Sequence, residues 1–196
     1  PAGLGRTGRL WAYDEGGVCP DIMGCGKGMS AAIYPLSSAT YRKHLQSFFD
    51  DNAFAHLSST GGSELGCVTA LAMLDQITEP GFLEHVQAMG QRFEDGFAAL
   101  REKYPEVLKG LNRRGLMIGV VMSHKDCGML MARALAARGV IAVYAHYNPH
   151  ILQLMPPLVI QPEEVDEVLD AFDGAFQEVG TALSLVRAVD ESSNRY

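Results

Sequence analysis

One lysine stands out in this sequence as a residue that could do chemistry. Lys27 lies between Gly26 and Gly28, after a short apolar stretch and before the small residues at 30–32. A lysine amine is a nucleophile only when it is deprotonated, so it needs surroundings that favour the neutral form or a carbonyl group that captures it as an imine. Lysines in glycine-rich loops are otherwise solvated turn residues. Both interpretations of Lys27 are open at this point.

A second candidate is a loop rich in hydroxyl groups and glycines over residues 58–63, directly before an apolar segment from about 65 to 77. That segment predicts a helix with apolar residues nearly all round, which favours deep burial. Hydroxyl groups and free N–H groups at a helix N-terminus hold a phosphate well. The loop is therefore either a phosphate contact or an ordinary helix-capping loop.

The elements that must position these loops are those of a mixed α/β chain. Short apolar pieces separated by turns occupy residues 9–23, and residues 41–49 suit a short helix or an exposed segment. A long amphipathic helix is expected from about 79 to 104, with apolar residues at three- and four-residue steps.

The second half predicts a small α+β lobe in the order strand, helix, strand, strand, helix. The expected elements are a strand at 115–122, a helix at 126–138 closed by Gly139, strands at 140–145 and 151–155 joined by a turn at Asn148 and Pro149, and a helix from Pro162. We therefore expect a partial large domain over 1–78, a connecting helix over 79–105, a small α+β domain over 106–189 and a polar tail over 190–196.

Composition narrows the function classes. The net charge is −7 with no basic run, which argues against nucleic acid or an anionic membrane surface as a partner. No apolar stretch approaches the roughly 20 residues of a membrane span, so a cytoplasmic location is expected. The four cysteines are scattered without metal-ligand spacing, and they favour reduced thiols over disulfides or a metal site.

The order of segments resembles class III aminotransferases, which depend on pyridoxal phosphate. The resemblance is carried by Gly-Arg-Thr-Gly at 5–8, Pro-Asp-Ile at 20–22 with Gly-Lys-Gly at 26–28, the hydroxyl loop, and Leu-Met-Pro-Pro-Leu at 154–158 followed by Pro-Glu-Glu at 162–164. It covers about residues 3–180, and the motifs come in the family's order. It implies an α/β fold: the C-terminal part of a fold type I large domain, followed by the α+β small domain.

For Lys27 the resemblance implies that the amine forms the internal aldimine with pyridoxal 5'-phosphate and then moves a proton between substrate and cofactor. For the hydroxyl loop it implies a contact to the cofactor phosphate of the neighbouring subunit, and Ser59 and Thr60 are equal candidates. A homodimer with shared active sites is expected, or a complementary N-terminal chain. The substrates would be a small-molecule amine and a keto acid.

Two departures from the family pattern matter. Gln153 stands where many members have an arginine that binds a substrate carboxylate, and an amide cannot make that charged bidentate contact. This favours an amine or ω-amino acid as the donor. A complete member is about twice as long, and its aspartate for the cofactor's ring nitrogen precedes the Gly-Arg-Thr-Gly turn.

Three functional hypotheses follow. The first is the C-terminal half of an aminotransferase that transfers an amino group from an amine or ω-amino acid to a keto acid. The second is a non-enzymatic fragment that acts as an oligomerisation or binding module. The third keeps the cofactor but changes the reaction, to that of an aminomutase, decarboxylase or racemase, because a fold does not fix a reaction.

Overall fold

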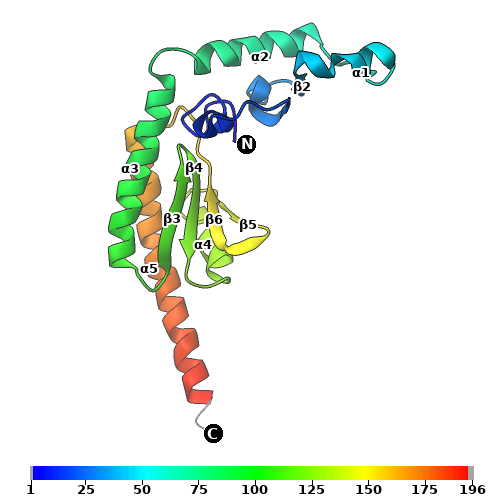
Figure 1. Cartoon of the computed structure of the whole chain (residues 1–196). Helices are drawn as coiled ribbons and strands as arrows, with labels where there is room; N and C mark the ends of the chain where they lie inside the picture. Colours follow the sequence, from blue (N-terminus) through cyan, green and yellow to red (C-terminus); the bar gives the residue numbers. More distant parts are fainter. Residues whose placement is uncertain (1, 194–196) are drawn as a thin grey trace. The chain divides into compact units, whose positions relative to one another are not determined.

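The computed structural model describes the backbone of residues 2–193 and the side chains of residues 2–184. The chain divides into two compact units between Glu84 and His85. Within the described residues, the first unit contains a two-stranded sheet and the second a four-stranded sheet (Figure 1). No helix in the described part is long and apolar enough to cross a membrane.

The first unit is built around a β-hairpin and one long helix. Its elements are η1 (Ala12–Gly16), β1 (Ile22–Cys25), η2 (Lys27–Ser30), β2 (Ser38–Tyr41), η3 (Lys43–Leu45), α1 (Gln46–Asp51) and α2 (Glu64–Ile77). Strands β1 and β2 are antiparallel, and Cys25 pairs with Ser38. This pair brings together the two ends of residues 26–37, which we call the lysine loop.

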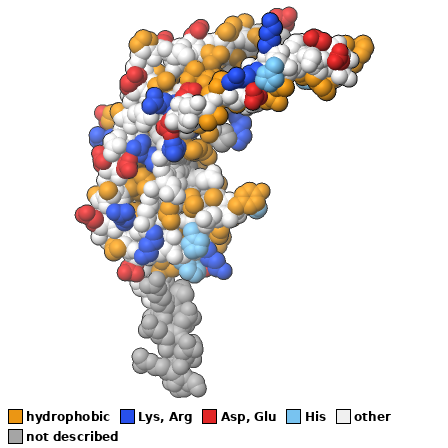
Figure 2. Space-filling model, viewed as in Figure 1, with side chains coloured by type: hydrophobic (Ala, Val, Ile, Leu, Met, Phe, Trp, Pro, Cys, Tyr) orange, Lys and Arg blue, Asp and Glu red, His pale blue; other side chains and the backbone are white. Residues whose placement is uncertain are grey.

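Helix α2 confirms the helix expected from 65 to 77, but the prediction of deep burial all round is wrong for this chain. Its buried stripe consists of Gly66, Ala70, Met73 and Ile77. On other faces of the helix, Leu65, Val68 and Leu71 are 61%, 61% and 59% exposed. Figure 2 shows hydrophobic side chains at the surface of this unit along α2. The described residues thus leave an apolar face of α2 uncovered.

The second unit holds most of α3 (Phe82–Lys103), then β3 (Leu108–Arg114), β4 (Met117–Met122), α4 (Cys127–Ala136), β5 (Val143–Ala145), β6 (Asn148–Leu154) and α5 (Pro162–Ser193). The strands form an antiparallel sheet in the order β3-β4-β6-β5. The helix expected from Pro162 is confirmed. Residues 194–196 of the expected tail lie outside the described residues, and α5 continues to Ser193.

The sheet corrects two predictions. Strand β3 was not expected, because its sequence is mostly polar and an edge strand needs no continuous apolar run. The next strand begins at Met117 rather than at 115, since Gly115 has a φ of +53° and lies in the turn between β3 and β4.

The turn expected at Asn148 and Pro149 is also misplaced. Both residues belong to β6, and the turn lies at His146 and Tyr147. Pro149 is tolerated because it comes near the start of the strand, before the residues of β6 that pair with β4. The preceding strand is correspondingly short, at Val143–Ala145 instead of 140–145.

The core of this unit lies on one face of the sheet. Burial alternates along β4 and β6, so that Ile118, Val120, Leu152 and Leu154 are buried while their neighbours are only half-buried. Four fully buried phenylalanines come from α3 and α5: Phe93, Phe97, Phe172 and Phe176.

An aromatic ring pair and two surface ion pairs join α3 and α5. The rings of Phe97 and Phe172 meet edge to face, with centroids 4.8 Å apart. At the surface, the Arg92 guanidinium donates to both carboxylate oxygens of Asp166, and this hydrogen bonding holds the pKa of that carboxyl below its usual value. Hydrogen bonds from Lys103 lower the pKa of Asp173 in the same way. The two helices therefore share a ring cluster and two surface ion pairs.

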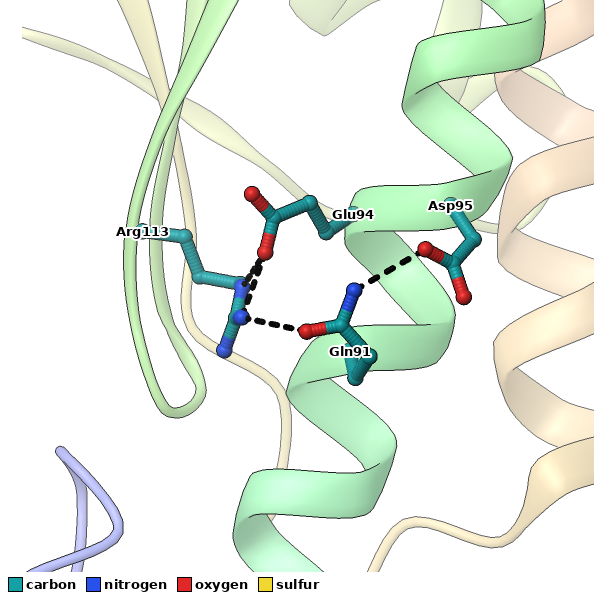
Figure 3. Close-up of polar contacts among 4 residues, drawn as sticks. All are labelled: Gln91, Glu94, Asp95 and Arg113. Atoms are coloured by element: carbon teal, nitrogen blue, oxygen red, sulfur yellow. Dashed lines mark hydrogen bonds and ion pairs between the residues drawn. The ribbon is translucent and has the colours of Figure 1, made fainter.

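A side-chain network also joins β3 to α3 (Figure 3). Arg113, whose side chain is only 14% exposed, donates from Nε to Glu94 Oε2 over 2.9 Å and from Nη2 to Gln91 Oε1 over 3.1 Å. Gln91 in turn donates to Asp95 over 2.9 Å. This network and the close approach of Gly90 to Gly115 hold the β3–β4 turn against the helix.

We expect Gly90→Ala to destabilise the second unit. A Cβ at Gly90 would lie 2.5 Å from the Gly115 carbonyl oxygen and 2.7 Å from Arg113 Nη1. Overpacking of this kind costs about 1–3 kcal/mol, which exceeds the roughly 1 kcal/mol of helix propensity that alanine gains over glycine. The matched control is Gly110→Ala, where an added Cβ meets nothing within 4 Å. Chemical denaturation should show a lower midpoint for Gly90→Ala than for the control, and equal midpoints would contradict the packing described here.

Candidate functional site

The lysine loop begins with a turn that places Lys27 in an unusual backbone conformation. Gly26 is extended, and Lys27, the first residue of η2, has a φ of +52°. Ala31 and Ala32 have φ values of +51° and +62°. Residues other than glycine lose roughly 1–2 kcal/mol each in this left-handed region. Three such residues in one short loop show that surrounding contacts fix its conformation.

Lys27 lines a cavity of about 490 Å³ in the first unit. The other lining residues all come from the lysine loop, and they are Ala32, Tyr34, Pro35, Leu36 and Ser37. The Lys27 side chain is exposed. Its amine is therefore accessible to a small molecule that enters the cavity.

The interior of the loop is held by two side-chain hydrogen bonds. Ser30 is completely buried, and its hydroxyl donates to the carbonyl oxygen of Tyr34. Ser38, at the start of β2, donates from its hydroxyl to the Met29 sulfur over 3.4 Å. These bonds and the Cys25–Ser38 strand pair make residues 26–37 a closed surface loop packed by its own side chains.

Helix α2 packs against η2, and its Gly66 lies against the part of the lysine loop that follows η2. A Cβ added at Gly66 would lie 3.0 Å from Tyr34 Cδ1 and 3.3 Å from Leu36 Cδ1. Tyr34 and Leu36 both line the cavity. Because Gly66 has no side chain, Tyr34 and Leu36 in the second half of the lysine loop can pack closely on α2.

The hydroxyl loop leads into α2 with exposed side chains. Ser58 Oγ accepts a hydrogen bond from the Gly61 N–H over 2.8 Å, and Gly62 has a φ of +71°. Ser59 and Thr60 are exposed. The N-cap residue Ser63 makes no side-chain capping bond, and the first N–H groups of a helix have no partner within the helix. The loop therefore offers hydroxyl and N–H donors to an anion.

The cavity does not bring together all the residues singled out in the sequence. Neither Ser59 nor Thr60 is among the residues that line it beside Lys27. Gln153 belongs to the second unit, where it lies in β6 and pairs with Gly119 of β4 and Val143 of β5. Gln153 is half-buried and alternates with the buried Leu152 and Leu154, so it lies on the sheet face opposite the core.

The first unit also contains a partly buried thiol and a second cleft. Burial raises the pKa of the Cys25 thiol, two residues before Lys27, which favours its protonated form. A smaller cleft of about 200 Å³ lies beside β1 and β2 and is lined by Tyr13, Tyr41 and Arg42 among others. Among the described residues, no group of three or more His, Cys, Asp or Glu side chains could hold a metal ion.

Comparison with known proteins identifies the family. The model of the class-III aminotransferases matches residues 1–176. The chain belongs to the class-III aminotransferase family. It is 34% identical over 175 residues to an uncharacterized aminotransferase of Archaeoglobus fulgidus, and 33% identical over 177 residues to an acetylornithine aminotransferase of Caldanaerobacter subterraneus. These alignments cover 89% and 90% of this chain but only 41% and 43% of the relatives.

Solved structures agree. The acetylornithine aminotransferase of Elizabethkingia anophelis superposes with a TM-score of 0.81 at 28% identity, over 90% of this chain and 46% of that one. A transaminase from a marine Virgibacillus gives a TM-score of 0.85 at 23% identity, over 93% of this chain and 44% of that one, and shows the fold alone. The chain thus has the α/β fold of the C-terminal part of a fold type I aminotransferase, and it spans less than half the length of these family members.

Sequence reasoning missed the residues that support the lysine loop. Ser30, Tyr34 and Gly66 are common residue types, and their roles depend on contacts between the loop and α2. One signal was present in the sequence: the helix that follows the hydroxyl loop contains a glycine, which lowers helix propensity and often marks a close approach by another segment.

We expect Gly66→Ala to disturb the lysine loop. The added methyl group would push the Tyr34 ring aside by a few tenths of an ångström, and an overpacking cost of about 1–3 kcal/mol would be partly offset by the roughly 1 kcal/mol that alanine gains over glycine in a helix. Gly24→Ala is the control, because a Cβ there meets nothing within 4 Å. Hydrogen exchange of the loop amides should be faster in Gly66→Ala than in the control. In a Tyr34→Ala background, which lacks the ring, Gly66→Ala should accelerate exchange much less than it does in the wild type, and an equal acceleration in both backgrounds would refute this contact.

Proposed function

We propose that this chain is the C-terminal half of a pyridoxal-phosphate-dependent aminotransferase and that Lys27 is its catalytic lysine. The observation that carries the proposal is that Lys27, the residue assigned by the motif order, lines the 490 Å³ cavity with an exposed side chain. The reaction is amino-group transfer from an amine or ω-amino acid to a keto acid. Family membership over residues 1–176 supports this reaction class.

The residues present fit pyridoxal phosphate as the cofactor. The cavity beside Lys27 has room for a small aromatic ring, and the α2 N-terminus offers donors for a phosphate without a side-chain cap from Ser63. When bound, this cofactor supplies the electron sink for bonds at the substrate carbon. Lys27 would attach it covalently through its amine, and after release that same amine would serve as the base that moves the substrate proton.

The hydroxyl loop would bind the cofactor phosphate. Ser59 and Thr60 remain equal candidates, since both side chains are exposed next to the helix N-terminus. Because neither lines the Lys27 cavity of its own chain, the loop is better suited to the site of a neighbouring subunit. This supports a homodimer with shared active sites.

The uncovered apolar face of α2 also supports association of this chain with another chain. Leu65, Val68 and Leu71 are all about 60% exposed, although apolar side chains spaced in this way on one helix are usually packed. A second copy of the chain, or a complementary N-terminal chain, would cover this face. The division into large domain, connecting helix and small domain, and the cytoplasmic location, stay predictions.

The amine donor is proposed from Gln153. Its side chain is half-buried and lies on the sheet face away from the core. An amide there offers one neutral donor group, whereas arginine would offer a charged bidentate pair to a carboxylate. A diamine or an amino acid whose reacting amine is remote from its carboxylate is therefore the preferred donor, and acetylornithine is one candidate because several relatives carry its name.

The first experiment tests covalent capture of the cofactor. Incubation with pyridoxal phosphate, reduction with borohydride and peptide mapping should give a label on Lys27 that exceeds the label on Lys109 of the second unit by about tenfold or more. Lys27→Arg, which keeps the charge but is not an amine nucleophile at neutral pH, should lose that label. Equal labelling of the two lysines would contradict the catalytic role and favour the non-enzymatic binding module.

The second experiment tests the donor class in labelled, unreduced protein. Loss of the cofactor's absorbance should be faster with a diamine or an ω-amino acid than with an α-amino acid. Gln153→Arg should raise the rate with carboxylate-bearing donors relative to the diamine by roughly tenfold, the value of one charge-assisted contact. Gln153→Glu is the matched control and should shift the ratio the other way. An unchanged ratio in both variants would exclude Gln153 from donor selection, and release of carbon dioxide would favour the decarboxylase alternative.

A further inference from the structure

The lysine loop contains one fully buried polar side chain, that of Ser30, although the rest of the loop is exposed or half-buried. Most of residues 26–37 are exposed or half-buried, yet Ser30 is 0% exposed. Among the described residues, only Thr7 is a similarly buried polar side chain. Burying a hydroxyl is costly unless it is hydrogen-bonded, and the Ser30 hydroxyl donates to the Tyr34 carbonyl oxygen. The bond is therefore a structural device of this loop.

The position of this bond matters for the cavity. Lys27 is the first residue of η2 and Ser30 is the last. Tyr34 belongs to the second half of the loop, which supplies the other lining residues of the cavity. Between them, Ala31 and Ala32 both have left-handed backbone conformations. The side-chain bond thus closes the turn that separates Lys27 from the other lining residues.

Two backbone hydrogen bonds belong to the same turn. The Ala31 N–H donates to the Gly28 carbonyl over 3.0 Å, and the Ile33 N–H donates to the Ser30 carbonyl over 3.0 Å. Neither acts directly on Tyr34. Without the Ser30 hydroxyl, the Tyr34 carbonyl would lose this partner, and the left-handed residues would be free to relax toward ordinary conformations.

We propose that Ser30 is a positioning residue for Lys27. It holds η2 and the Tyr34 side of the loop at a fixed separation, and so keeps the Lys27 amine at the cavity. The role of Ser30 rests on the proposed function of Lys27 and deepens it. Ser30 touches no reacting atom, because its hydroxyl is buried and directed to the Tyr34 carbonyl.

Tyr34, which accepts the Ser30 hydrogen bond, is itself held by its contact with Gly66 of α2. Tyr34 is seated on α2, since its ring lies where a Gly66 Cβ would be 3.0 Å away. A hydrogen bond from Ser30 to Tyr34 therefore ties η2 to a residue that the longest helix of the first unit already holds. This bond therefore adds to the direct packing of α2 on η2 in setting the position of Lys27.

The experiment compares the whole chain with Ser30→Ala and with Ser47→Ala, an equal change at an exposed serine of α1. Two quantities are measured in each: hydrogen exchange at the amides of Ala31 and Ile33, and the rate of borohydride-trapped labelling of Lys27 by pyridoxal phosphate. Ser30→Ala should speed exchange at these amides about tenfold, the equivalent of one lost hydrogen bond, and should slow Lys27 labelling to a similar degree. Exchange in β4 and labelling of Lys109 should not change, and Ser47→Ala should match the wild type.

The outcomes separate positioning from mere stabilisation. Faster loop exchange with unchanged Lys27 labelling would overturn the proposal, because the bond would then hold the turn without setting the lysine. Unchanged exchange would overturn it as well. Acceleration throughout the first unit would show that the variant unfolds the unit, and Ser30→Thr, which keeps the hydroxyl, must then restore both quantities for the proposal to stand. If Lys27 of the wild type is not labelled, the proposed function fails. Faster exchange in Ser30→Ala that is confined to the loop would then still show that Ser30 holds the loop conformation.

Discussion

The packing of Tyr34 on Gly66 is the contact on which the geometry of the candidate site depends. Helix α2 is the longest helix of the first unit, and it meets the lysine loop where a side chain is missing. A larger residue at that point would have to displace the side chains of Tyr34 and Leu36 by a few tenths of an ångström. Helix α2 therefore supports two of the residues that line the cavity, although it contributes no lining residue itself.

This arrangement explains how a short surface loop can keep an unfavourable backbone. Lys27, Ala31 and Ala32 together cost a few kcal/mol in left-handed conformations, which is a large part of what one small unit can spare. The β1–β2 pair fixes the ends of the loop, and the Tyr34 seat fixes its middle. A backbone held at both places has no relaxed alternative nearby, so the amine at Lys27 stays at the cavity.

The helices could be predicted from the sequence better than the sheet. Helices α3 and α5 have long amphipathic patterns and proline or acidic starts, and such local signals do not depend on partners. Strand β3 and the extent of β6 depend on pairing across the sheet, which no local pattern shows. In the candidate site, Lys27 and the hydroxyl loop were predicted from motif order, and their roles stay predictions. Ser30 and Gly66 could not be predicted, because their roles come from three-dimensional contacts.

Helix α2 shows why a correct pattern led to a wrong burial prediction. An apolar pattern around a helix predicts burial, but it does not show whether the burying surface comes from the same unit. Its buried stripe packs on η2, while Leu65, Val68 and Leu71 have no comparable cover in the described residues. The same helix thus carries two surfaces with different tasks: one supports the lysine loop from within the unit, and the other is suited to an apolar partner.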